Sequence, residues 1–290
     1  MANSKKRLAT NVAGAFFVDS TCIDCDTCRQ LAPETFKELG DYSSVFCQPG
    51  TEAQEQAALR ALVACPTGSI GCEKAFDAKA ALAQFPMLIE GEVYYCGFNS
   101  EKSYGANSYF VKHADGNWLI DSPRSTAHLL KAFELMGGIK YIFLTHRDDV
   151  ADANEFAEHF KAERIIHRDE LSALPEAEIV IETNEHEDFS ADFRIICVPG
   201  HTKGHCLLLY KNKYLFSGDH LHFDRDSRHL AAFPDHCWYS WQEQSASMSR
   251  LAVHSFEWVL SGHGQSVCQS RDQNRVQLLE LAETMKSIKR

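Results

Sequence analysis

The pattern of apolar and polar residues divides the chain into two segments of different character. The first, residues 1–82, shows little periodicity. Its one clear helix is expected at 51–64. Thr51 is a suitable N-cap for this helix, and Cys65-Pro66 ends it. The second, residues 83–290, alternates strand-like and helix-like runs. That alternation favours a mixed α/β plan, so we expect two domains with the boundary after residue 82.

The pattern of the second segment predicts a series of short strands, with longer helices between some of them. Strands are expected at 88–96, 108–112, 118–120, 140–144, 164–167, 178–182, 193–198, 206–210, 214–216 and 258–260. Helices are expected at 126–136, 151–161 and 273–288, after a short connecting helix at 75–84. No run approaches the roughly eighteen apolar residues of a membrane-spanning helix, so no membrane span is expected.

Cysteine and histidine are distributed in opposite ways along the chain. Six of the eleven cysteines precede residue 73, whereas all fourteen histidines lie at or beyond His113. The first residues lack the apolar core of an export signal, so we expect a cytoplasmic location, where cysteines stay reduced or bind metal. This distribution indicates two different metal chemistries in the two segments.

Four cysteines of the first segment have the spacing of an iron–sulfur site. Cys22, Cys25 and Cys28 form a C-x2-C-x2-C motif, and Cys65 follows at a distance with a proline directly behind it. Three thiolates on one loop and a fourth from a remote segment suit the four corners of a [4Fe–4S] cluster. A zinc site with four cysteine ligands is the alternative, although such sites usually use two separate cysteine pairs.

The first segment resembles the single-cluster ferredoxins of bacterial type over nearly its whole length. Two-cluster ferredoxins have a further cysteine, followed by proline, after three more residues. Here Ala32 and Pro33 hold those positions, so one cluster is expected. Outside the motif, Cys47 and Cys72 are expected to be buried, inert thiols, and nothing supports a disulfide between them.

Four short motifs in the second segment each follow an apolar strand. They are Thr-His at 145–146, Gly-His-Thr at 200–202, Ser-Gly-Asp at 217–219 and Gly-His-Gly at 262–264. Short loops at strand ends allow imidazoles and carboxylates to converge on one ion. Their order resembles the metallo-β-lactamase fold over roughly residues 88–290. The expected class is therefore α+β, with a small ferredoxin-like domain followed by an αβ/βα sandwich. The chain is similar to the ferredoxin/metallo-β-lactamase fusion proteins of photosynthetic organisms.

The first ligand motif departs from the usual family pattern, H-x-H-x-D-H. The second histidine is replaced by Asp148, the acid by Val150 and the last histidine by Ala151. A second metal site would need the acid and the histidine that are missing. At most one ion is therefore expected in this domain.

The resemblance implies a ligand set for that one ion. The set combines two imidazoles and two carboxylates, with a third histidine beside them: His146, Asp148, His201, Asp219 and His263. Two nitrogens and two oxygens suit Zn²⁺ or Fe²⁺. If the site activates water, Asp149 and Asp152 are the candidates for the general base. His205, His220 and His222 crowd the same loops and are expected to support the ligands or lie on the surface.

Charge and chemistry together leave three functional hypotheses. The first is a redox-linked metallo-hydrolase or oxidoreductase, acting with a redox partner protein or on a small-molecule substrate. The second is a non-catalytic binding or assembly factor that uses the lactamase-like domain for docking and the cluster as an electron carrier or redox sensor. The third, a nuclease, is disfavoured because the net charge of −11 repels phosphate backbones, so no nucleic acid is expected.

Overall fold

The computed structural model describes residues 2–288 and divides into two compact units. The first comprises the residues up to 139 together with 151–160, and the second comprises 140–150 and the chain from 161 onward. This division does not test the predicted domain boundary after residue 82, which stays a prediction. The predicted ranges 1–82 and 83–290 also include residues 1, 289 and 290, which lie outside the described residues.

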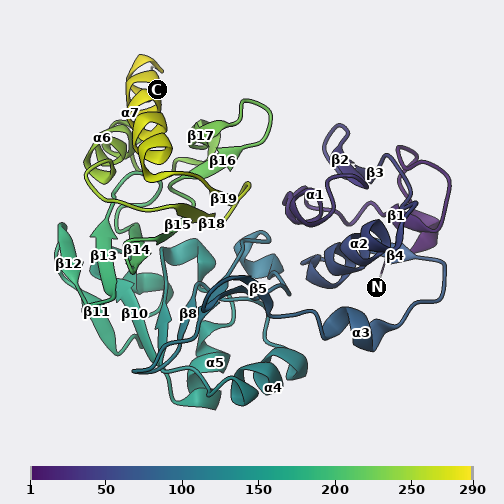
Figure 1. Cartoon of the computed structure of the whole chain (residues 1–290), viewed down its shortest axis with the longest axis horizontal. Helices are drawn as coiled ribbons and strands as arrows, with labels where there is room; N and C mark the ends of the chain where they lie inside the picture. Colours follow the sequence, from purple (N-terminus) through teal and green to yellow (C-terminus); the bar gives the residue numbers. More distant parts are fainter. Residues whose placement is uncertain (1, 289–290) are drawn as a thin grey trace. The chain divides into compact units, whose positions relative to one another are not determined.

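The N-terminal part of the first unit is built from short elements around a small apolar core. Two antiparallel pairs and three helices make it up: β1 (Phe16–Val18) with β4 (Ile70–Cys72), β2 (Phe36–Glu38) with β3 (Ser43–Val45), α1 (Thr27–Leu31), α2 (Glu52–Ala64) and α3 (Ala78–Leu82) (Figure 1). Thr51 caps α2 through a reciprocal capping box with Gln54, which confirms the helix predicted at 51–64.

The rest of the first unit is an antiparallel meander with two helices. Its elements are β5 (Met87–Glu90), β6 (Val93–Tyr95), β7 (Tyr109–Val111), β8 (Trp118–Ile120), α4 (Ala127–Leu135) and α5 (Ala153–Phe160). The single strand predicted at 88–96 is wrong. Gly91 takes a positive φ of 58° and turns the chain back, so this run forms two paired strands.

The second unit contains a parallel ladder and a larger mixed sheet. In the ladder, β10 (Glu163–His167) lies between β9 (Tyr141–Phe143) and β11 (Ile179–Ile181). The larger sheet has the order β12-β13-β14-β15-β18-β19, whose strands are His186–Asp188, Phe193–Cys197, Cys206–Tyr210, Tyr214–Gly218, Trp258–Ser261 and Val267–Cys268. The strands predicted at 206–210 and 214–216 are confirmed as the antiparallel pair β14 and β15, and Lys211 and Asn212 both have positive φ in the turn between them.

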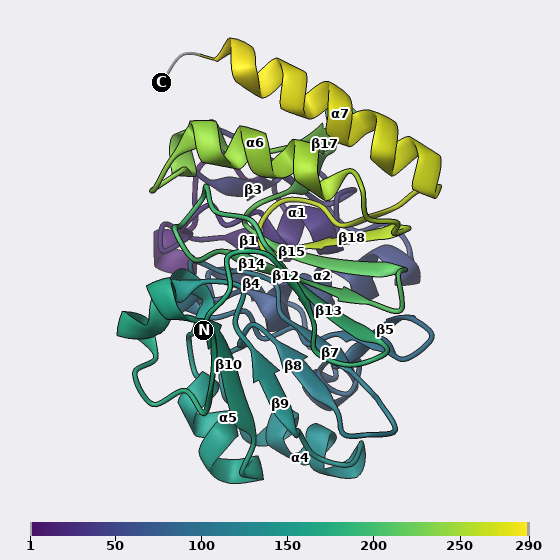
Figure 2. The same cartoon turned by 90° about the vertical axis from the view of Figure 1, so that its left-hand side faces the viewer.

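Two helices lie side by side on the larger sheet, α6 (Trp241–Leu251) and α7 (Arg271–Ser287) (Figure 2). A small hairpin, β16 (His222–Asp224) with β17 (His229–Ala231), lies near α7. The predicted C-terminal helix is confirmed, whereas α6 was not predicted. Its buried face includes Gln244, Ser245 and Ser247, so the apolar periodicity is weak. No helix within residues 2–288 has both the length and the apolar character needed to cross a membrane.

Candidate metal centres

The four cysteines predicted to hold a cluster line one small cavity in the first unit. Cys22 and Cys25 lie in the loop before α1, Cys28 lies in α1 and Cys65 is the C-cap of α2. The loop can bend around a cluster because Asp24 and Asp26 both adopt the left-handed backbone conformation, which aspartate tolerates better than most residues. The structure therefore brings together all four predicted cluster ligands.

Burial controls the protonation of these thiols. It raises the pKa of Cys25 to about 12 and raises the pKa of Cys22 and Cys28, and each thiol disfavours ionisation of its neighbours. The thiolate forms therefore need the positive charge of iron to stabilise them. The N–H of Asp24 donates to Cys22 Sγ at 3.4 Å and that of Ser69 to Cys65 Sγ at 3.3 Å. Donors of this kind suit cluster sulfurs, so the cavity fits the cluster.

A loop from the second segment covers one of these cysteines. The carbonyl of Gly105 accepts from Asn99 Nδ2 at 2.7 Å and from Thr27 Oγ1 at 3.3 Å. A Cβ on Gly105 would lie 2.8 Å from Cys25 Sγ, and its φ is +85°, so no other residue fits there without strain. The cysteine motif gave no indication of this cover. Neither of the other two cysteines considered as buried thiols is fully buried: Cys47 is exposed, and Cys72, the last residue of β4, is half-buried.

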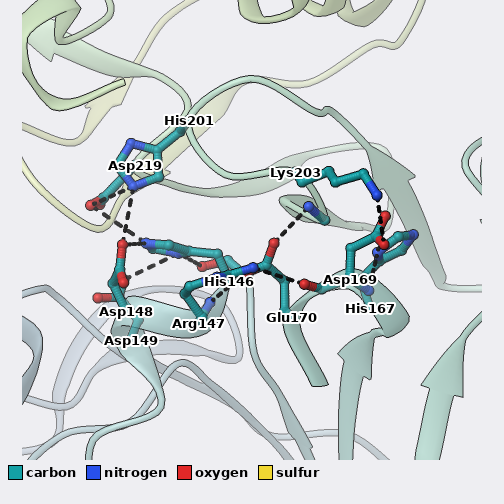
Figure 3. A network of polar contacts seen from close by, with 12 residues as sticks. His146, Arg147, Asp148, Asp149, His167, Asp169, Glu170, His201, Lys203 and Asp219 are labelled. Atoms are coloured by element: carbon teal, nitrogen blue, oxygen red, sulfur yellow. Dashed lines mark hydrogen bonds and ion pairs between the residues drawn. The ribbon is translucent and has the colours of Figure 1, made fainter. Parts of the chain in front are cut away.

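The predicted ligands of the second site lie in the second unit, in segments that follow strands, and Figure 3 shows four of them close together: His146, Asp148, His201 and Asp219. His146 follows β9, Asp148 lies in the 3₁₀ turn Arg147–Asp149, His201 lies between β13 and β14, and Asp219 follows β15. His146 Nε2 and His201 Nε2 each lie 3.6 Å from Asp148 Oδ2 and 3.7 Å from Asp219 Oδ2. His263, after β18, lies with Nε2 3.8 Å from the same oxygen of Asp219.

Two glycines allow these loops to approach one another. A Cβ on Gly200 would lie 2.4 Å from the backbone of Gln244, and a Cβ on Gly262 would lie 2.6 Å from Asp219 Oδ1. A larger residue at either position would displace the loop that carries His201 or His263. These glycines belong to the motifs that predicted the ligands, which explains why short sequence patterns located the site.

The polar atoms at the centre of this site are buried and aimed at a common point. His146 Nε2, His201 Nε2 and Asp219 Oδ1 have no hydrogen-bond partner within the described part of the chain. The ligand atoms of His146, Asp148 and His201 all lie within 4.8 Å of one another. Buried polar atoms without partners are rare unless an ion or water satisfies them. The donor set of nitrogens and carboxylate oxygens fits Zn²⁺ or Fe²⁺.

The protonation states suit a metal site. Burial lowers the pKa of His146 to about 4, so this imidazole is neutral at pH 7. Proximity to His201 lowers the pKa of Asp148. Burial alone would raise the pKa of Asp219. The electrostatic attraction of His263, His146 and His201 outweighs burial, so the pKa is lowered. The site therefore presents the neutral imidazole of His146 and two ionised carboxylates, which are forms that bind metal.

A buried glutamate connects the two loops that carry ligands. Glu170 Oε2 accepts from the backbone N–H of Arg147 at 3.2 Å and from its side chain, while Oε1 accepts from the N–H of Gly204 at 2.6 Å (Figure 3). Its side chain is fully buried. Glu170 thus fixes the turn before Asp148 and the loop of His201. Sequence reasoning missed it because a single glutamate outside every motif carries no signal.

The two predicted general bases lie in different surroundings. Asp149 is buried, and its Oδ2 lies 3.9 Å from His146 Nδ1. Thr145 Oγ1 lies 3.0 Å from the same nitrogen. Asp152 pairs with Lys102 Nζ at 2.6 Å and accepts from the N–H of Ser125 at 2.8 Å, all within the first unit. Thr145 Oγ1 is placed to orient the His146 ring, whereas Asp149 joins His146 and Asp219 in a group whose ligand atoms all lie within 4.8 Å of one another. Asp152, the residue before α5, is tied to the segment around Ser125. The catalytic role of Asp149 and Asp152 stays a prediction.

The remaining histidines of these loops are buried. His205 and His220 are fully buried and His222 is 7% exposed, so the surface position considered for them is wrong. Burial lowers the pKa of His220 to about 3 and that of His205 well below its usual range. The loops fold over these rings because glycines at their ends allow close packing.

Two known families match consecutive parts of the chain. Residues 18–72 match the family described as the 4Fe-4S single cluster domain of ferredoxin I, and residues 88–285 match the metallo-beta-lactamase superfamily. The first match favours the [4Fe–4S] cluster over the zinc alternative. A solved metallo-β-lactamase from Hirschia baltica is 16% identical, with a TM-score of 0.52 over 68% of this chain and 96% of its own. That likeness confirms the predicted α+β fold class.

Two curated relatives are hydrolases. The hydroxyacylglutathione hydrolase of Acidiphilium cryptum (strain JF-5) is 28% identical over 118 residues, which is 39% of this chain and 48% of the relative. That of Pelagibacter ubique (strain HTCC1062) is 34% identical over 89 residues, 29% of this chain and 36% of the relative. The chain thus spans less than half the length of these relatives. Because one family covers most of its length, the chain belongs to the metallo-β-lactamase superfamily, with a single-cluster ferredoxin domain before that fold.

Proposed function

We propose that the protein is a metal-dependent hydrolase with one ion at the histidine–aspartate site and a [4Fe–4S] cluster as its electron carrier. One observation carries the proposal. His146 Nε2 and His201 Nε2 are buried, have no hydrogen-bond partner among the described residues, and lie 3.6–3.7 Å from two carboxylates. Such an arrangement is unfavourable without a cation and stable with one.

The proposed substrate is a small molecule with a thioester or ester carbonyl. The matching relatives are named hydroxyacylglutathione hydrolases, although the chain spans less than half of their length. A bound divalent ion supplies Lewis acidity and a water of lowered pKa. The neutral imidazole of His146 and the ionised carboxylates of Asp148 and Asp219 are forms that hold such an ion.

The chain's own residues provide orientation and a proton acceptor. Thr145 Oγ1 lies 3.0 Å from Nδ1 of His146 and holds its ring so that Nε2 faces the site. His263 is not needed for a second ion, because Val150 and Ala151 replace the other ligands. Its side chain is 19% exposed and lies 3.8 Å from Asp219 Oδ2, so we assign it the role of accepting a proton from the attacking water.

The cluster is proposed to exchange electrons with a redox partner protein in the cytoplasm. This part of the proposal rests on the single-cluster ferredoxin match. The non-catalytic alternative, in which the second domain only docks a partner, is supported by the substitution of two family ligands at Val150 and Ala151.

Metal analysis and thioester hydrolysis by matched variants test the proposal. His201→Ala removes a buried ligand, and His186→Ala removes an exposed imidazole on β12 as a control. We expect loss of one zinc or iron and of hydrolysis in the first variant only, with the cluster absorbance unchanged in both. A wild-type protein that binds one ion yet hydrolyses no thioester or ester supports the docking alternative, and one that binds no ion refutes the proposed site.

A further inference from the structure

Two cysteines outside both metal centres face each other across a strand pair. Cys197 ends β13 and Cys206 begins β14, and the two residues are directly opposed in the antiparallel register. The thiol of Cys206 donates to Cys197 Sγ at 3.4 Å. Neither residue has a role in the proposed hydrolase, so this inference goes beyond that function.

The backbone between them is suited to a disulfide. The N–H of Val198 donates to the carbonyl of His205 at 2.8 Å, and the N–H of Cys206 donates to the carbonyl of Thr145 at 2.9 Å rather than across the pair. Cys197 and Cys206 therefore form a non-hydrogen-bonded pair, whose Cα atoms are typically about 4.5 Å apart. That separation lies within the range of about 4.4–6.8 Å that disulfides span.

The two thiols differ in a way that assigns them different roles. Donation from Cys206 lowers the pKa of Cys197, whereas burial raises the pKa of Cys206. Cys197 is 8% exposed and Cys206 is fully buried. A thiolate is the nucleophile in disulfide exchange, so Cys197, the one of the two that lines a pocket, attacks first and Cys206 follows.

Cys197 lines a pocket of about 280 Å³ that carries charges of both signs. Arg168 and Lys203 supply two cations, and Asp169 and Glu243 supply two carboxylates. Lys203 Nζ pairs with Asp169 at 3.1 Å but keeps a half-exposed side chain. A small ligand with both carboxylate and ammonium groups can form ion pairs with these charged side chains of the pocket.

We propose that Cys197 and Cys206 form a thiol–disulfide exchange site for small amino-acid-type disulfides. The Cys197 thiolate attacks one sulfur of the disulfide, forms a mixed disulfide and releases the first thiolate. The Cys206 thiol gives its proton to that departing thiolate, and its sulfur then attacks Cys197 Sγ and releases the second thiolate, which is protonated by solvent. Two protein thiols are oxidised, one small disulfide is reduced to two thiols, and the new bond closes a ring around the loop of His201.

The test uses the cluster-loaded protein, incubated without oxygen with cystine, then blocked and analysed by peptide mass spectrometry. We expect a peptide pair linked through Cys197 and Cys206 in the wild type. Cys206→Ala stops at a mixed disulfide on Cys197, and Cys206→Ser gives the same result if alanine disturbs the sheet. The exposed Cys47 is the internal control for unselective reaction.

Two outcomes would overturn the proposal. One is the absence of the linked pair in the native protein when the same protein forms it after unfolding in urea. The other is faster reaction at Cys47 than at Cys197. For the pocket, we expect the double variant Arg168→Gln, Lys203→Gln to react about tenfold more slowly with cystine but at the wild-type rate with the uncharged 2-hydroxyethyl disulfide. Equal slowing or no slowing for both disulfides would refute the charge recognition.

Discussion

The two metal centres respond to burial in opposite ways. Burial favours the uncharged form of any titratable group. At the cysteine centre this raises the pKa of Cys25 to about 12 and leaves protonated thiols that cannot bind metal. At the histidine centre it lowers the pKa of His146 to about 4 and leaves the neutral imidazole that can. The histidine centre is thus ready for an exchangeable ion, whereas the cysteine centre acquires its ligand form only as the cluster enters and protons leave.

The largest expected effect is the loss of the cluster from one centre with no change in metal binding at the other. Cys28 is buried in α1 and lines the cysteine cavity. We expect Cys28→Ala to abolish the cluster, measured by iron, sulfide and visible absorption, while zinc binding at the histidine site is unchanged. A Cys28→Ala protein that keeps its full cluster would break the comparison, because Cys28 would then not be a ligand.

Removing a buried imidazole should affect only the other centre. We expect His201→Ala to weaken zinc binding by about 1000-fold, or about 4 kcal/mol, in competition with a chelator. The reason is that Asp148 and Asp219 lose one of the two nitrogens that face them. His186→Ala, on an exposed edge strand, should bind zinc like the wild type. Equal affinity of the two variants would place the ion elsewhere.

The lowered pKa of His146 can be tested by measuring the stability of the protein as a function of pH. Folded His146 titrates at about 4 and the unfolded residue near 6.5, so between these values the unfolded chain binds the extra proton. The free energy of unfolding of the zinc-free protein should therefore fall as pH drops from 6.5 towards 4. This one group contributes at most about 3 kcal/mol. Urea titrations at pH 7 and pH 5 should show that His146→Gln loses less free energy of unfolding between these pH values than the wild type does. An equal loss in the two proteins would contradict the lowered pKa of His146.

The connection between the ligand loops should have a moderate effect. Glu170→Gln keeps the shape but weakens the contacts to Arg147 and to the N–H of Gly204. We expect about tenfold weaker zinc binding with the cluster intact, in line with residues that orient ligands. Glu176→Gln, at an exposed position, is the matched control. No difference between the two would mean that Glu170 supports only the fold.

The smallest effect concerns the cover of the cluster. Gly105 has a positive φ of 85°, and a Cβ there would lie 2.8 Å from Cys25 Sγ. We expect Gly105→Ala to cost about 1 kcal/mol in stability and to shift the reduction potential of the cluster. Gly40→Ala, where a Cβ meets nothing within 4 Å and φ is also positive, controls for backbone strain. Identical potentials in both variants would show that the loop does not reach the cluster.

The comparison also explains what could be predicted from sequence. The cysteine ligands were found because three lie within one short motif, and the histidine ligands because each follows an apolar strand. Features held by tertiary contact were missed. Glu170 belongs to no motif, and α6 buries Gln244 and Ser247 through hydrogen bonds to the carbonyls of His220 and Pro199, so its pattern looks polar. Gly91, inside one apolar run, split a predicted strand into two.

The metal content of the protein, purified without oxygen, tests the central claim most directly. Iron, sulfide and zinc should be counted per chain, and the extra ion should be located by anomalous scattering. The account predicts about four iron and four sulfide ions at the cysteine centre. It also predicts one further zinc or iron ion between His146, Asp148, His201 and Asp219. Two further ions, or none in a protein that keeps its cluster, would contradict it.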